Sequence, residues 1–119
     1  MLYLDTYALM EIYRGNESYL SLLENSYIVC ELTLCEYYAV LFREEGEKVA
    51  QAWYDKFIPF VQPTPLSVLR DGIMYRMENK VLNLSLFDAI GYQHALSKHG
   101  AFVTGDKSFE KLPHVKYVK

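Results

Sequence analysis

The sequence predicts an α/β fold, a three-layer α/β/α sandwich in which helices cover both faces of a central parallel sheet of about five strands. Short apolar segments typical of buried strands alternate with segments of helical periodicity along the chain. Hydrophobic residues make up 51% of the chain and charged residues 23%, the composition of a packed globular protein. No repeat, low-complexity tract or Ser/Gly linker interrupts this pattern, so we expect a single domain over residues 1–119.

The first half of the chain contains two short apolar segments, each followed by helical periodicity. Residues 1–4 and 27–30 are the predicted strands. Gly15 and Gly46 mark helix ends, since glycine is common just after the last helical residue. Apolar residues at helical spacing predict helices over 8–13, 18–24, 33–45 and a further segment that ends near 57.

The second half begins with a strand that we expect at an edge of the sheet. Residues 58–61 are apolar, but Pro59 has no N–H to donate to a strand ladder. Pro63 and Pro65 then indicate a loop. Helices are predicted over 66–79 and from Ser85 to about 100, strands over 101–103 and 115–118, and a loop or helical turn over 104–112.

Composition and charge exclude several classes of function. The longest uncharged stretch has 13 residues, whereas a membrane-spanning helix needs about 20, so we expect no membrane protein. The net charge of −3 argues against sequence-independent coating of nucleic acid. Cys30 and Cys35 fit neither a disulfide framework nor a zinc ribbon, and we expect two buried thiols. The N-terminus has no basic leader, so we expect a cytoplasmic protein.

Four acidic residues lie where a predicted strand ends or a predicted helix begins, namely Asp5, Glu36, Asp88 and Asp106. Each has a local structural explanation. The segments Thr33–Glu36 and Ser85–Asp88 fit the capping-box pattern, and the two aspartates that follow strands are suited to N-capping. Taken singly, none of the four acids predicts a functional site.

Together the four acids predict a metal site. In an open parallel sheet, ligands bind beyond the carboxyl ends of the strands, where the strand order reverses. Carboxylates gathered there repel one another unless a cation is present, and oxygen ligands suit Mg²⁺ or Mn²⁺. Such a site favours phosphodiester hydrolysis, because metal ions activate water and neutralise charge on the leaving oxygen. The residues alone do not identify the substrate.

Four motifs carry a resemblance to a known family: Leu4-Asp5-Thr6, Thr33-x-x-Glu36, Leu84-Ser85-x-x-Asp88-Ala89 and Val103-Thr104-Gly105-Asp106. In this order they resemble the acidic motifs of PIN-domain ribonucleases, and they are most similar to the small toxins of the VapC type. The resemblance implies a PIN-like fold and Mg²⁺- or Mn²⁺-dependent endoribonuclease activity on RNA. It also implies catalytic and metal-binding roles for Asp5, Glu36, Asp88 and Asp106, with Thr6 and Thr104 in supporting positions.

The resemblance further implies a homodimer and an antitoxin that lays a segment along a groove and blocks the acidic site. Ordinary core packing explains most of the apolar group that includes Tyr13 and Tyr19, and we expect part of this group to form the antitoxin groove or the dimer surface. Two residues depart from the family pattern. Tyr7 stands where a small or polar residue is common, and its bulk would narrow the site. Ser108 stands where many members have a further acid.

Two alternative functions stay open at this point. A catalytically inactive PIN-like module would bind RNA or protein without turnover. A receiver-like domain would need a phosphoacceptor acid after a central strand, whereas Asp55 precedes the strand-like segment. Among basic residues, Lys107 adjoins Asp106 and is the best placed to contact RNA phosphate, ahead of Arg14, Arg43 and Lys80.

Overall fold

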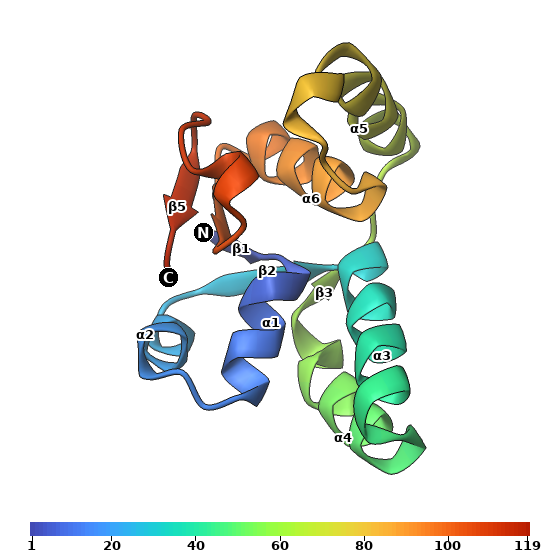
Figure 1. Ribbon diagram of the computed structural model, residues 1–119, viewed down its shortest axis with the longest axis vertical. Helices are drawn as coiled ribbons and strands as arrows, with labels where there is room; N and C mark the ends of the chain where they lie inside the picture. The colour runs from blue at the N-terminus through green and yellow to red at the C-terminus, as the bar shows by residue number, and fades with distance from the viewer.

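The centre of the protein is a five-stranded sheet, described over residues 1–119 by a computed structural model (Figure 1). The strands are β1 (Leu2–Leu4), β2 (Tyr27–Cys30), β3 (Val61–Gln62), β4 (Ala101–Thr104) and β5 (Val115–Tyr117). Their order is β3-β2-β1-β4-β5, and every neighbouring pair is parallel. From β1 the chain adds β2 and then β3 toward one edge of the sheet. It then crosses back to place β4 on the other side of β1, and β5 forms the opposite edge. The predicted parallel sheet is confirmed.

Helices cover both faces of this sheet, which confirms the three-layer α/β/α sandwich. The helices are α1 (Thr6–Tyr13), α2 (Glu17–Leu20), α3 (Glu31–Glu45), α4 (Glu47–Phe57), α5 (Leu66–Glu78) and α6 (Leu86–Ser97). Short 3-10 helices are η1 (Ser21–Glu24), η2 (Ile58–Phe60), η3 (Lys80–Leu82) and η4 (Lys107–Phe109). Figure 1 shows α1 to α4 on one side of the sheet and α5 and α6 on the other. None of the helices combines the length and apolar character needed to cross a membrane.

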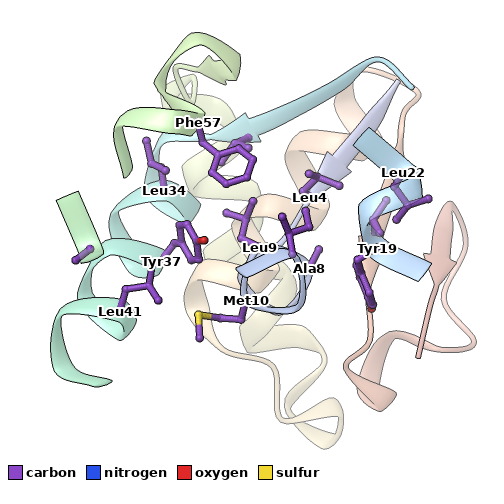
Figure 2. Close-up of a cluster of buried hydrophobic side chains, with 14 residues drawn as sticks. Leu4, Ala8, Leu9, Met10, Tyr19, Leu22, Leu34, Tyr37, Leu41 and Phe57 are labelled. Atoms are coloured by element: carbon purple, nitrogen blue, oxygen red, sulfur yellow. The ribbon is translucent and has the colours of Figure 1, made fainter. Parts of the chain in front are cut away.

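The strands separate two hydrophobic cores, because successive side chains of a strand point to opposite faces. Leu4, Val29 and Val103 belong to the core beneath α1, α3 and α4, part of which Figure 2 shows. Their neighbours Tyr3 and Phe102 belong to the core on the α6 side. Both faces of the central strands are thus buried, as parallel sheets require.

The predicted strand over 58–61 differs from the structure. Ile58–Phe60 forms the 3-10 helix η2, and only Val61 and Gln62 pair with β2. Pro59 lies at the start of this turn, where its fixed φ is tolerated and its missing N–H costs nothing. The predicted position at the edge of the sheet is confirmed.

Helix α3 begins two residues earlier than predicted, which removes one predicted cap. Its N-cap is Cys30, whose side chain makes no capping hydrogen bond. Thr33 therefore lies inside the first turn and is buried, so the predicted capping box with Glu36 does not form. Glu31, the first residue of α3, contacts the loop after β3, since its carboxylate accepts a hydrogen bond from the Thr64 N–H at 2.7 Å. The Glu36 side chain is left free for other contacts.

Two expectations about side-chain exposure were wrong. Tyr19 is fully buried, and its hydroxyl donates to the Val118 carbonyl, so it anchors the C-terminal segment and is not part of a partner surface. Cys30 is buried as predicted, but Cys35 is exposed, because it lies on the outer face of α3.

Candidate active site

Three of the predicted acids line one pocket beyond the carboxyl ends of β1 and β4, where the strand order reverses. Asp106 follows β4, Asp88 lies in the first turn of α6, and Glu36 comes from α3. Asp5, directly after β1, is only 1% exposed and does not line the pocket surface. Its charge nevertheless interacts with those of Asp88 and Asp106, so the four acids form one electrostatic cluster.

The pocket has a volume of about 550 Å³, and we call it the acidic pocket. Its walls come from α1, α3, the start of α6 and the loop after β4. The lining residues are Thr6, Tyr7, Met10, Arg14, Glu36, Val40, Ser85, Asp88, Gly105, Asp106 and Lys107.

Asp5 has one oxygen with a structural role and one without. Its Oδ1 accepts the Ala8 N–H at 2.8 Å and caps α1, as predicted. Its Oδ2 is buried and has no hydrogen-bond partner. Burial, followed by the charges of Asp88 and Asp106, raises the pKa of Asp5 well above its usual range, while the Thr104 hydroxyl and the Ala8 N–H act in the opposite direction. A buried unpaired oxygen in an acidic cluster needs an explanation, and a cation would supply one.

Asp88 is held at the start of α6 by the predicted cap. The Ser85 side chain accepts the Asp88 N–H at 3.1 Å. Burial and the charges of Glu36 and Asp106 raise the pKa of Asp88 to about 7, although hydrogen bonding by Ser85 lowers it. Strongly perturbed acids in a cleft are characteristic of functional sites.

The two predicted supporting threonines contact the acidic cluster. The Thr6 hydroxyl donates to Glu36 Oε1 and so links α1 to α3. Thr104 is fully buried, and its Oγ1 accepts the Asp106 N–H at 3.0 Å. Asp106 Oδ1 in turn accepts the Ser108 N–H at 2.9 Å, which caps η4. Ser108, where a further acid is common, therefore orders the Asp106 side chain through its backbone.

The donor set of the acidic pocket suits a hard divalent cation. It offers carboxylate and hydroxyl oxygens without a histidine or cysteine, which favours Mg²⁺ or Mn²⁺ over zinc. The unpaired Asp5 Oδ2 adds a further oxygen nearby. No three acidic, histidine or cysteine side chains stand in a ready-made metal cage. Mg²⁺ needs fewer protein ligands than such a cage, since that ion keeps several waters and is commonly bound by one or two carboxylates together with substrate phosphates.

Sequence reasoning overlooked one wall of the acidic pocket. Met10 and Val40 were not considered, and Tyr7 was considered only as an obstruction. The signal was available in the helical spacing, because Tyr7, Met10 and Arg14 are separated by three and four residues, and Val40 follows Glu36 by four. Counting helical turns from the acids would have found this wall.

Other residues considered from the sequence lie elsewhere. Of the four basic candidates, Arg14 and Lys107 line the acidic pocket, whereas Arg43 and Lys80 do not. Asp55 is an exposed residue of α4 whose carboxylate accepts from Gln51 at 2.8 Å. It therefore lies outside the acidic pocket and gives no support to a receiver-like site.

The fold and the pocket define an α/β protein with a carboxylate cluster at the topological switch point of its sheet. The family model that describes the PIN domain matches residues 2–115. The chain belongs to the PIN domain family. A comparison with curated protein sequences found no match.

Several solved structures share the fold. The VapC20 toxin of Mycobacterium tuberculosis, described as a sarcin–ricin loop cleaving toxin, aligns with a TM-score of 0.81 and 14% identity over 95% of each chain. VapBC2 from Rickettsia felis, bound to a DNA fragment from its promoter, aligns with a TM-score of 0.79 and 19% identity over 100% of each chain. A toxin–antitoxin complex from Klebsiella pneumoniae aligns with a TM-score of 0.76 and 20% identity over 98% of this chain and 96% of the other.

Proposed function

We propose that this protein is a metal-dependent endoribonuclease that hydrolyses RNA phosphodiester bonds. The acidic pocket carries the proposal, because its carboxylates gather where the strand order reverses. Burial, together with the charges of Glu36 and Asp106, raises the pKa of Asp88 there to about 7. Membership of the PIN domain family and the shared fold with a toxin described as cleaving the sarcin–ricin loop support it.

In this proposal the four acids Asp5, Glu36, Asp88 and Asp106 hold Mg²⁺ or Mn²⁺ and are the catalytic residues. When bound, the ion activates water for attack and neutralises charge on the leaving oxygen. Thr6 positions Glu36 through its hydrogen bond, and Thr104 orders the backbone at Asp106. Lys107, in the pocket wall, contacts an RNA phosphate.

We also propose that the protein is the toxin of a VapBC-type toxin–antitoxin pair in the cytoplasm. Solved structures with the same fold include toxin–antitoxin complexes. The antitoxin would cover the acidic pocket and exclude RNA from it, and a second copy of the chain would form a homodimer.

A cleavage assay with matched aspartate variants tests the nuclease proposal. Labelled single-stranded and structured RNAs are incubated with the purified protein in EDTA, Mg²⁺ or Mn²⁺. We expect cleavage only with the metal, and a loss of at least about 100-fold in Asp5→Asn and Asp88→Asn. Asparagine caps a helix about as well as aspartate, so Asp5→Asn keeps the cap of α1.

Asp71→Asn is the matched control, because Asp71 is exposed on α5 and pairs only with Arg70 at 3.3 Å. It should cleave like the unmodified protein. Equal cleavage by all variants would identify a contaminating nuclease and contradict the proposal. Metal-independent RNA binding without cleavage would instead favour the inactive module.

A further inference from the structure

The side chains of the acidic pocket wall along α1 change from apolar to cationic with distance from the acids. Tyr7, Met10 and Arg14 lie on one face of α1, and Val40 lines the pocket from α3 one turn beyond Glu36. The pocket is therefore acidic at the strand ends, apolar along its middle and cationic at Arg14. The rise of an α-helix places Arg14 about 10 Å beyond Tyr7.

The Tyr7 ring packs directly against Gly105 in this wall. A Cβ atom at position 105 would lie 2.1 Å from Cε1 and 2.5 Å from Cζ of Tyr7, closer than any real side chain allows. Because Gly105 has no side chain, the ring rests directly against the loop after β4. Tyr19 supports it from another direction, with ring centroids 6.1 Å apart. The ring is thus held beside the carboxylates and is not a loose plug across them.

Tyr7 still presents part of its surface to the pocket. It is 39% exposed, although its immediate neighbours Ala8 and Leu9 are fully buried. The two cations of the pocket, Arg14 and Lys107, have no acidic partner, since the only ion pair in the structure joins two residues of α5. The partly exposed Tyr7 ring lies between the carboxylates, which hold the metal under the proposed function, and the free Arg14 guanidinium. This order matches phosphate, base and phosphate along a nucleic acid strand.

We propose that this wall is a nucleotide-binding subsite in which Tyr7 stacks on an unpaired RNA base beside the bond to be cleaved, and Arg14 binds a neighbouring phosphate. The inference rests on the proposed ribonuclease function and adds the two residues that would hold a nucleotide beside the acids. A base inside a duplex has no free face, so the RNA must be single-stranded at this nucleotide. Stacking accepts any base, so the subsite selects strand structure rather than sequence.

An abasic scan tests the stacking contact. The probe is a labelled single-stranded RNA of about eight nucleotides in which one base at a time is removed, and binding is measured by fluorescence anisotropy. All proteins carry Glu36→Gln, which stops cleavage under the proposed function. With Tyr7 intact, removing one particular base should weaken binding about 5- to 150-fold. In Tyr7→Ala the same removal should have no further effect, and Tyr7→Phe should behave like the intact protein.

Matched variants separate stacking from general damage. Phe42→Ala removes an exposed aromatic ring of α3 that does not line the acidic pocket, and its abasic profile should be unchanged. Arg14→Ala should lower the slope of log affinity against log salt by about 0.7, the value for one phosphate contact on a single strand. Circular dichroism verifies that each variant is folded.

The outcomes distinguish this inference from the proposed function. Identical abasic profiles for Tyr7 and Tyr7→Ala would overturn the subsite while leaving the nuclease intact. Unchanged RNA binding in Tyr7→Ala together with weaker antitoxin binding would assign the wall to a protein partner and also overturn the inference. An unmodified protein, with Glu36 and Tyr7 both intact, that neither binds nor cleaves RNA would defeat the proposed function itself.

Discussion

At the scale of single residues, the acidic pocket is built from side chains that destabilise the protein when no cation is bound. Burial and mutual repulsion raise the pKa values of both Asp5 and Asp88 above the ordinary value for aspartate. The folded protein therefore holds these protons more tightly than the unfolded chain, and folding stability falls as the pH rises from about 4 through about 7.

We predict that Asp88→Asn stabilises the metal-free protein while removing its cleavage activity. The amide cannot ionise, so the variant avoids the repulsion that Asp88 meets above pH 7, and the Ser85 cap is retained because it binds the backbone N–H. The gain in free energy of unfolding should grow by about 1–3 kcal/mol between pH 5 and pH 8.

Urea unfolding at both pH values, in EDTA, measures this gain. Asp71→Asn is again the control, since its side chain is exposed and should show no such dependence. A gain that is equal at pH 5 and pH 8 would contradict the prediction. Addition of Mg²⁺ should stabilise the unmodified protein more than Asp88→Asn.

The sequence was sufficient to nominate the acids but not to describe their surroundings. Asp5 and Asp106 were found because they follow apolar strands, and both also cap helices as predicted. Glu36 was interpreted as the end of a capping box, because that pattern fits locally. In the structure α3 already begins at Glu31, whose carboxylate accepts from the Thr64 N–H 33 residues away, and no local pattern contains that contact.

At the scale of elements, the position of Asp88 depends on how α5 packs on α6. Gly72 of α5 lies against Ile90 of α6, and a Cβ atom at position 72 would lie 2.5 Å from Ile90 Cγ1 and 2.6 Å from its Cα. Because a backbone atom is involved, a change of rotamer would not relieve the clash. The two helices must separate if any side chain is added.

Overpacking of a core costs about 1–3 kcal/mol, whereas alanine gains roughly 1 kcal/mol over glycine inside a helix. We therefore predict that Gly72→Ala destabilises the protein by up to about 2 kcal/mol. Chemical denaturation measures the change, with Asp71→Ala at an exposed position of the same helix as the control. A Gly72→Ala variant more stable than the unmodified protein would contradict the prediction, because it would show that α5 can move away from α6 without cost.

Helices with clear start and stop residues were predictable, whereas the shortest strand was not. The helices α5 and α6 were predicted within about three residues of their bounds, because Pro63 and Pro65, Ser85 and Gly100 mark where they begin or end. The edge strand β3 has only two residues and owes its place to pairing with β2. Such a short strand leaves no signal distinct from the neighbouring turn.

At the scale of the whole molecule, the α5 side exposes apolar residues on which the proposed homodimer can be tested. Leu66, Ile73 and Met77 share one face of α5, and Val81 follows in η3. All four are exposed, and grouped apolar surface of this kind usually marks an interface. Homodimers commonly use the same patch on both copies.

We predict that Ile73→Glu and Met77→Glu convert a dimer into a monomer, because each places a charge inside the buried patch. Sedimentation velocity measures the state at several concentrations. Leu20→Glu, at an exposed apolar position of α2, is the matched control and should remain dimeric. An unmodified protein that stays monomeric at high concentration would refute the homodimer.

The strand order also divides the molecule into two complementary halves. Residues 1–62 contain β1, β2 and β3 and contribute Asp5 and Glu36, whereas residues 66–119 contain β4 and β5 and contribute Asp88 and Asp106. The pairing of β1 with β4 is the only ladder that joins them. Neither half carries a complete set of acids. A chain cut within the Pro63–Pro65 loop would therefore regain the whole cluster only if its two fragments reassociated through the β1–β4 pairing.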